Sequence, residues 1–234
     1  MTDPGRREEL ALRLADVRGR MAKACEAAGR DVGELTLIAV TKTRPASDVR
    51  LLSELGVADV GENRDAEAAP KAAECAGLNL TWHFVGQLQT NKAASVVRYA
   101  SVVHSVDRLR LVRALGRAAR GAERVVECLV EVSLDGDPAR GGAAAGDVPA
   151  LAEALAAEEG LVLGGVMAIA PLSMEPADAF ARLLASAAAV RGIRPGATMI
   201  SAGMSGDLEA AVEAGATHLR IGTALLGDRG PRVR

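Results

Sequence analysis

Lys42 follows an apolar segment of the chain, residues 35–40, at the point where a buried strand would end. Because side chains alternate across a strand, Lys42 shares a face with Ile38 and Val40, and we expect it to point into the protein interior, partly out of water. Burial disfavours the charged ammonium form of a lysine, and the free amine attacks carbonyl carbons. Lys42 is therefore a candidate Schiff-base lysine; the alternative is a strand-end lysine whose charged end reaches solvent.

Two turns near the C-terminus contain residues that could hold a phosphate group. Met204 and Ser205 follow one predicted strand, and Gly222 and Thr223 follow the next. Backbone N–H groups and hydroxyls at the start of a helix bind phosphate, although the same residues also serve as ordinary caps and turns. An amine that attacks aldehydes, next to a phosphate site, suits pyridoxal 5′-phosphate (PLP), which has both groups. Arg220, a charge in an otherwise apolar segment, could face the pyridine nitrogen of PLP.

Further polar residues come after the second and third predicted strands. Asn63 follows Gly-Glu at the end of the second strand and could hydrogen-bond a cofactor ring, or could belong to an ordinary loop. Gln87, Gln89, Asn91 and Lys92 follow the third strand. This polar cluster could bind a ligand or could simply solvate the start of a helix.

His83, His104 and His218 all fall within predicted strands. In the sequence none of them pairs with a carboxylate or a serine at a catalytic spacing, so we interpret each as a structural histidine with satisfied hydrogen bonds. The chain shows no paired acids, nucleophile elbow or metal motif. Cys25, Cys75 and Cys128 are widely separated, which predicts reduced thiols and neither disulfides nor zinc.

The elements that must position these residues form a repeating pattern. Eight short apolar segments alternate with alanine-rich helical stretches, after a leading helix at about residues 8–29. Eight such units predict a single (β/α)8 TIM-like barrel over residues 1–234, with its site at the carboxyl ends of the strands. The alternative, an open doubly wound sheet, often carries a glycine-rich fingerprint where this chain reads VTKTRP. The predicted strands are residues 35–40, 57–61, 82–86, 102–106, 124–132, 161–170, 198–203 and 218–222.

Charge and hydropathy narrow the environment of the protein. Twenty-eight basic and 30 acidic residues give a net charge of -2, which provides no general attraction for nucleic acid or anionic lipid. No apolar run reaches the roughly 20 residues that span a membrane, and the N-terminus is charged. We expect a cytoplasmic protein with no nucleic-acid or membrane partner. A glycine-rich stretch, residues 136–147, is expected to be a mobile loop at the mouth of the barrel.

Seven segments in order match a known family: AVTKTRP, VGEN, WHFVGQLQTNK, HSVD, GVMAIAP, SAGMSGD and RIGTALLG. They extend from Ala39 to Gly227, and through them the chain closely resembles the YggS/PROSC family of PLP homeostasis proteins. The resemblance implies a barrel similar to the N-terminal domain of alanine racemase. It also implies an internal aldimine between PLP and Lys42, and a set of residues around the cofactor: Ser205, Gly222 and Thr223 for the phosphate, Arg220 for the ring nitrogen, and Asn63 and Met204 along the ring.

The same resemblance argues against turnover. Alanine racemase-like enzymes use a second domain that supplies a tyrosine base, and this length leaves no room for one. The single tyrosine, Tyr99, falls in a helical stretch before the fourth strand. We expect a non-catalytic PLP carrier or regulator, a monomer, with apo PLP-dependent enzymes as possible partners. The alternatives are a PLP-dependent amino-acid racemase-like enzyme and a cofactor-free Schiff-base aldolase.

Three positions depart from the family pattern. Arg64 stands where many relatives carry tyrosine, Arg140 where many carry lysine, and Ala202 where methionine is frequent. The change at Arg64 puts in doubt any ring contact from that position, whereas Lys42 and the phosphate turns keep the family residues.

Overall fold

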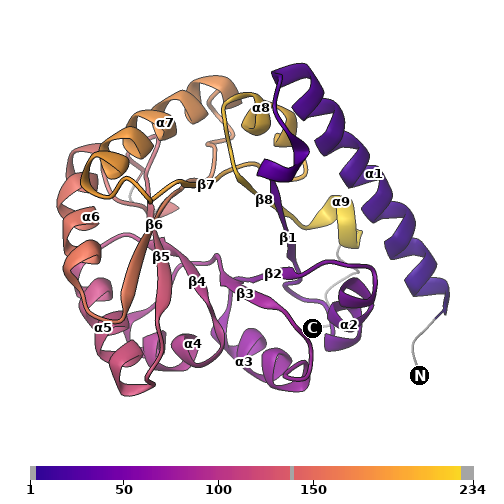
Figure 1. Cartoon of the computed structure of the whole chain (residues 1–234), viewed down its shortest axis with the longest axis horizontal. Helices are drawn as coiled ribbons and strands as arrows, with labels where there is room; N and C mark the ends of the chain where they lie inside the picture. The colour runs from indigo at the N-terminus through magenta and orange to yellow at the C-terminus, as the bar shows by residue number, and fades with distance from the viewer. Residues whose placement is uncertain (1–3, 138–139, 228–234) are drawn as a thin grey trace.

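The computed structural model of the chain describes residues 4–137 and 140–227. Eight parallel strands follow one another around a closed barrel in chain order, and the last strand pairs with the first (Figure 1). The predicted (β/α)8 barrel is confirmed. The strands are β1 (Thr36–Val40), β2 (Asp59–Glu62), β3 (Thr81–Phe84), β4 (Val102–Val106), β5 (Val126–Glu131), β6 (Leu161–Met167), β7 (Met199–Ser201) and β8 (His218–Ile221).

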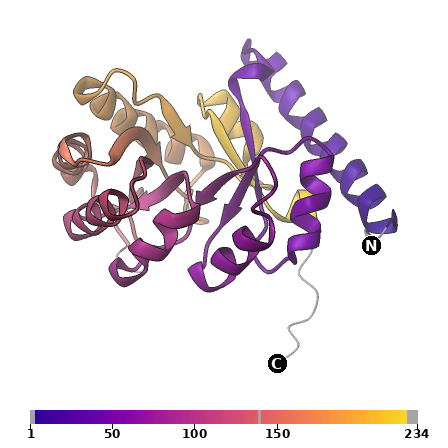
Figure 2. The ribbon, with the colours of Figure 1, turned by 60° about the horizontal axis from the view of Figure 1, so that its bottom comes forward.

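The helices lie outside the strands and form the outer layer of the barrel (Figures 1 and 2). The leading helix α1 packs on α8 and α9, close to the place where β8 meets β1. The α-helices are α1 (Pro4–Ala28), α2 (Ala46–Glu54), α3 (Asp65–Glu74), α4 (Ala93–Tyr99), α5 (Leu109–Gly121), α6 (Val148–Ala157), α7 (Pro176–Ile193), α8 (Leu208–Glu213) and α9 (Thr223–Leu226). Short 3-10 helices are η1 (Val32–Glu34), η2 (Thr90–Lys92) and η4 (Ala145–Asp147).

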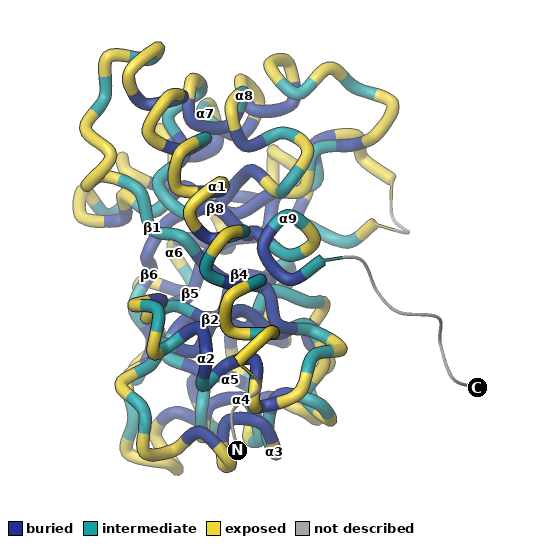
Figure 3. Tube along the Cα trace, turned by 90° about the vertical axis from the view of Figure 1, so that its right-hand side faces the viewer, coloured by how far each residue is buried: buried dark blue, intermediate teal, exposed yellow. Residues whose placement is uncertain are grey.

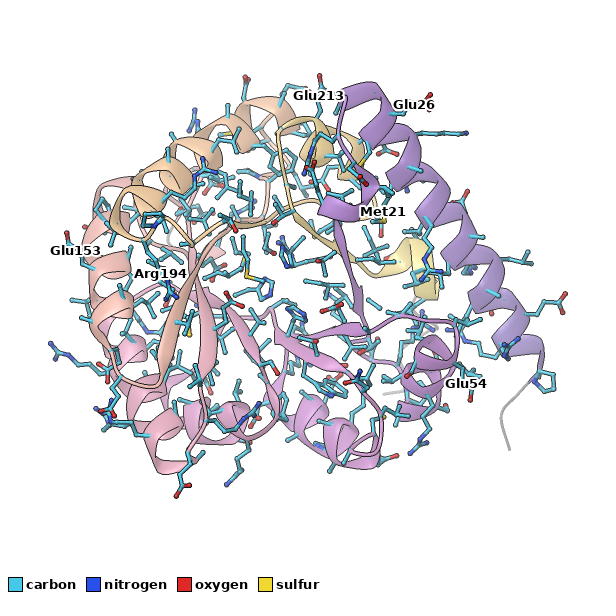
Figure 4. All side chains as sticks on the ribbon, in the orientation of Figure 1. Met21, Glu26, Glu54, Glu153, Arg194 and Glu213 are labelled. Carbon is cyan, nitrogen blue, oxygen red and sulfur yellow. The ribbon has the colours of Figure 1, made fainter. Side chains whose placement is uncertain are left out.

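The strands are largely buried on both faces because helices cover one face and packed side chains the other. All five residues of β4 are buried. Buried residues are concentrated in the strands, whereas exposed residues lie on the outer sides of the helices (Figure 3). Side chains fill the space inside the ribbon, and Glu26 and Glu153 lie on the outer surface (Figure 4). The interior of the barrel is thus a packed core, as is usual for this fold.

The strand ends differ from the predicted segments by a few residues. The largest difference is at β6, which was predicted to continue to residue 170 and ends at Met167. Beyond it, Ile169 is exposed at the rim of the barrel, so the apolar run continues past the sheet.

The glycine-rich stretch 136–147 returns to the end of β5. Val132 and Ala143 form an isolated parallel bridge, and the Ala143 N–H donates to the Glu131 carbonyl at 2.7 Å. Residues 138 and 139 of this stretch lie outside the described residues. The part that follows them brings Arg140 and Gly141 to the rim.

Candidate functional site

A cavity of about 460 Å³ opens at the carboxyl ends of the strands. The structure brings to its lining every residue that the sequence singled out for a cofactor: Lys42, Asn63, Met204, Ser205, Arg220, Gly222 and Thr223. These residues come from the ends of β1, β2, β7 and β8, which are neighbours around the closed barrel. Gln87 of the polar cluster also lines the cavity, whereas Gln89, Asn91 and Lys92 do not.

Lys42 lies two residues beyond the end of β1, after the strand as the sequence predicted. It is half-buried, in a turn that the Arg44 N–H closes on the Thr41 carbonyl at 3.0 Å. Thr43 in the same turn has a φ of 64°, an unusual value for a residue with a side chain. Lys42 lines the cavity together with Val40, Thr43 and Arg44, so the whole turn borders the site.

A buried ion pair holds the backbone next to Lys42. The Lys71 ammonium from α3 pairs with the Glu62 carboxylate of β2 and donates to the Thr41 carbonyl at 2.8 Å. The Thr41 hydroxyl also donates to Glu62, at 2.7 Å. Lys71 is 7% exposed and Glu62 is fully buried. Loss of either side chain would therefore leave the other as an unpaired charge in the core. Sequence reasoning missed Lys71, because a lysine in an alanine-rich helix gives no signal of burial.

Asn63 is positioned by close backbone packing. Gly86, after β3, lies against it so closely that a Cβ added to Gly86 would be 2.2 Å from the Asn63 carbonyl oxygen. Only glycine allows this approach. Arg64, the departure from the family pattern, is largely exposed near Glu67 at the start of α3 and does not line the cavity.

The turns after β7 and β8 pack on each other. The Ser205 hydroxyl accepts a hydrogen bond from the backbone N–H of Ala224 in α9 at 3.1 Å. Asp207 accepts from the Met204 N–H at 2.6 Å, and Arg20 of α1 donates to the Ser205 carbonyl at 3.1 Å. The two turns therefore bring Ser205 and Thr223 together in the lining of the cavity.

Arg220 extends from β8 into the interior and reaches the floor of the cavity. One guanidinium nitrogen donates to the Ser201 hydroxyl at 2.6 Å and the other to the Ala168 carbonyl at 2.8 Å. Burial lowers the pKa of Arg220 to about 10, which leaves the side chain charged at neutral pH. These two hydrogen bonds fix the guanidinium group, and its remaining N–H groups can donate to a ligand.

The hydrogen bonds of Arg220 continue through the barrel as an interior chain, which we define as Asp59, His83, His104, Ser201 and Arg220. His104 Nδ1 lies 2.9 Å from the Ser201 hydroxyl, and its Nε2 lies 2.9 Å from His83 Nδ1. His83 Nε2 lies 2.9 Å from the Asp59 carboxylate at the opposite end of the barrel.

The hydrogen bonds of His83 and His104 agree with their interpretation as structural histidines, although their partners could not be recognised from sequence spacing. Asp59 is 24 residues from His83 in the sequence, and Ser201 is 97 residues from His104. The side chains meet because the closed barrel places them in its interior. Burial holds the pKa of His104 well below its usual value. With both rings neutral, one arrangement satisfies every bond: each donor, from Arg220 through Ser201 and His104 to His83, points toward the acceptor Asp59.

Glu131, at the end of β5, is a cavity residue that sequence reasoning did not select. It is 8% exposed, and its Oε2 atom is buried without a hydrogen-bond partner among the described residues. Burial raises the pKa of Glu131 to about 7; Asp107 raises it further, while Arg220 and Arg108 oppose the shift. The sequence signal for Glu131 was an acidic residue at the end of an apolar strand.

Arg140 belongs to the cavity lining, and Tyr99 does not. Arg140 lines the cavity, donates to the Ile169 carbonyl at 2.9 Å and pairs with Asp135 at 3.3 Å. Tyr99 lies outside the cavity lining, edge-on to Trp82 with ring centres 6.4 Å apart, and burial raises its pKa.

No group of three potential metal ligands occurs in the part of the chain that the structure describes. No helix among those residues is long and apolar enough to cross a membrane.

Comparison with known proteins agrees with this geometry. A family model described as alanine racemase, N-terminal domain, matches residues 15–230. Alanine racemase from Corynebacterium glutamicum, 14% identical with a TM-score of 0.69 over 94% of this chain and 60% of that one, shows the same fold. Fold and site thus define a barrel of the alanine racemase N-terminal domain class.

Relatives with higher identity narrow this class. A pyridoxal phosphate homeostasis protein from Mycobacterium tuberculosis is 46% identical over 97% of this chain and 95% of its own length. The Escherichia coli protein of the same name is 34% identical over 94% of this chain and 97% of its length. PipY from Synechococcus elongatus, solved with PLP bound, is 35% identical with a TM-score of 0.81 over 93% of this chain and 100% of that chain. The chain belongs to the pyridoxal phosphate homeostasis protein family, as its motifs indicated.

Proposed function

We propose that this chain binds PLP reversibly, with Lys42 joined to the aldehyde carbon, and takes part in the intracellular supply of PLP without turnover of a substrate. The observation that carries the proposal is the gathering of an amine, hydroxyl-bearing turns and a guanidinium in one cavity. The PipY relative with PLP bound supports it.

The donor set in the cavity fits the functional groups of PLP. The Lys42 amine suits the aldehyde, the hydroxyls of Ser205 and Thr223 suit the phosphate, and Arg220 suits the pyridine nitrogen. Bound PLP supplies an electrophilic carbon and an electron-withdrawing ring. The protein residues hold and orient it: Lys71 and Glu62 fix the turn of Lys42.

The remaining cavity residues bear on whether the site turns over a substrate. No tyrosine, cysteine or histidine lines the cavity among the described residues, so a tyrosine base of the racemase kind is not supplied there. A racemase-like enzyme is the second candidate, because Glu131 and Lys42 are two titratable groups in one cavity. Exchange of the α-proton of amino acids in deuterated water by the loaded protein would favour the enzyme.

The first experiment is spectroscopic. Mixing the protein with PLP is expected to give the absorbance band of lysine-bound PLP, and Lys42→Ala to abolish it. Lys92→Ala is the control, because Lys92 is half-exposed and outside the cavity lining. Borohydride reduction and mass measurement then identify the adduct, since PLP and a sugar aldehyde differ in mass. A Lys42→Ala protein with an unchanged spectrum would refute the assignment.

We propose a cytoplasmic protein that acts as a monomer and passes PLP to apo PLP-dependent enzymes. Sedimentation of the loaded protein tests the monomer, and recovery of activity by an apo enzyme mixed with the loaded protein tests the transfer.

A further inference from the structure

Glu131 lies across the mouth of the barrel from Lys42. It ends β5, which is four strands from β1 in either direction around the eight-stranded barrel. Both side chains line the same cavity. Glu131 also lines a second hollow of about 360 Å³, which shares Arg140, Ile169 and Met204 with the first. The Glu131 carboxyl group therefore lies between the proposed PLP cavity and the second hollow.

The Glu131 carboxyl group forms no ion pair with any residue that the structure describes. Its Oε2 atom has no hydrogen-bond partner, and no cation lies within 4.0 Å of it, among the described residues. The charged groups that influence it are Arg220 from β8 and Asp107 and Arg108 after β4. Arg220 donates to Ser201 and Ala168, and Arg108 pairs with Asp107.

A buried carboxyl oxygen without a partner costs about 1–3 kcal/mol, more when ionised, so a ligand donor that reached Glu131 from the cavity would remove this cost. PLP itself does not supply the partner. Its aldehyde, phosphate and phenol oxygens are neutral or negative, and its ring nitrogen is expected to face the Arg220 guanidinium. The complementary group is a cation with N–H donors, small enough for the second hollow.

We propose that Glu131 binds the ammonium group of a primary amine, either a free α-amino acid or a lysine side chain of a partner protein, beside the PLP site. This inference rests on the proposed function for its biological meaning. The ammonium gives one proton to the Glu131 carboxylate and becomes the free amine, the form that reacts with aldehydes and imines. One proton leaves nitrogen and one arrives on oxygen, so the step is balanced without a further reactant. The amine is the chemical class that would collect PLP from Lys42.

Direct binding to PLP-free protein is the first test. With ¹³C-labelled glutamate, the Glu131 carboxyl is titrated by NMR in the absence and presence of l-alanine and of Nα-acetyl-lysine methylamide. A bound cation favours the ionised carboxylate, so at least one amine should lower the pKa of Glu131 by about 1 unit or more. l-Lactate, which has no ammonium group, should leave the pKa unchanged. The better of the two amines identifies the source, and no shift with either would overturn the proposal.

Matched variants give the second test. Glu131→Gln keeps the size and removes the charge, and should weaken amine binding to PLP-free protein at least tenfold by calorimetry. Asp135→Asn is the control: Asp135 lines the second hollow but already pairs with Arg140, so its loss should change amine binding less than twofold. Equal effects of the two variants would show a general field of negative charge and refute a site at Glu131.

Removal of PLP from loaded protein gives a third readout. Alanine arrives as an ammonium ion, whereas methoxyamine is a neutral nucleophile near pH 7. Glu131→Gln should slow removal by alanine about tenfold and leave removal by methoxyamine unchanged; equal slowing of both would refute the proposal. If the wild-type protein never shows lysine-bound PLP, the proposed function fails, while the binding measurements on PLP-free protein still decide the role of Glu131.

Discussion

Ser201→Ala removes one hydroxyl group from the centre of the interior chain. In the wild-type protein the Ser201 hydroxyl accepts from Arg220 at 2.6 Å and, with neutral histidines, donates to His104 Nδ1 at 2.9 Å. Ser201 and His104 are fully buried, and Arg220 is 5% exposed. Alanine therefore leaves a charged donor and a ring nitrogen without this partner in the core.

The expected cost follows from these two lost hydrogen bonds. A buried group left without a partner costs about 1–3 kcal/mol, so the two groups together should lower the unfolding free energy by about 2–6 kcal/mol. Domains of this kind have about 5–15 kcal/mol in total, so the loss is large enough to measure and small enough to leave a folded protein. PLP should also bind about tenfold more weakly, because Arg220 keeps only its bond to Ala168.

Urea unfolding of PLP-free protein measures the first quantity, and a PLP titration measures the second. Ser186→Ala is the matched control: Ser186 is also buried, but its hydroxyl makes only a 3.5 Å contact with the Arg182 carbonyl one helical turn away. The control should lose less than about 1 kcal/mol. If Ser201→Ala loses no more stability than Ser186→Ala, the interior chain contributes nothing and the reasoning is refuted.

Three further predictions concern packing and pH. Gly86→Ala should cost about 1–3 kcal/mol and weaken PLP binding, because the new Cβ would displace the Asn63 backbone, whereas Gly146→Ala, which meets nothing within 4 Å, should change neither urea midpoint nor affinity. Burial lowers the pKa of His218 to about 4, so between pH 6.5 and 4 the unfolded chain takes up a proton that the folded protein refuses. Stability should therefore fall with acidification by about 1.4 kcal/mol per pH unit from this group, and His218→Gln should flatten the profile. Glu131, with its pKa raised to about 7, acts in the opposite sense between pH 4.5 and 7, because the folded protein holds the extra proton there. Glu131→Gln should thus steepen the acid loss by a similar slope, and a profile that flattens instead would show the sign to be wrong.

The barrel and the gathering of the site residues could be predicted because they depend on local features. Apolar segments of strand length, separated by helical stretches, specify parallel strands, and such strands bring their carboxyl ends to one rim whatever their distance in the sequence. Lys42 and Thr223 are 181 positions apart in the chain, yet each follows a strand, so their meeting followed from the pattern.

The contacts across the interior could not be predicted in this way. The partners of His104 depend on which side chains of β3 and β7 face the axis at the same level, and that depends on strand register and on the closure of β8 against β1. The same holds for Lys71, whose burial depends on how α3 lies against β2.

The sequence by itself determined the kind of fold, the family and the set of residues at the mouth of the barrel, because periodicity, motifs and strand ends are properties of short segments. Only the tertiary structure decided that Lys42 stands on a turn held by Lys71 and Glu62, and that Arg220 leads a chain of hydrogen bonds to Asp59. It also decided that Glu131 faces the cavity without a counter-ion among the described residues. Burial and hydrogen-bond partners are set by neighbours that are distant in the chain, and in a barrel those neighbours exist only once the sheet has closed.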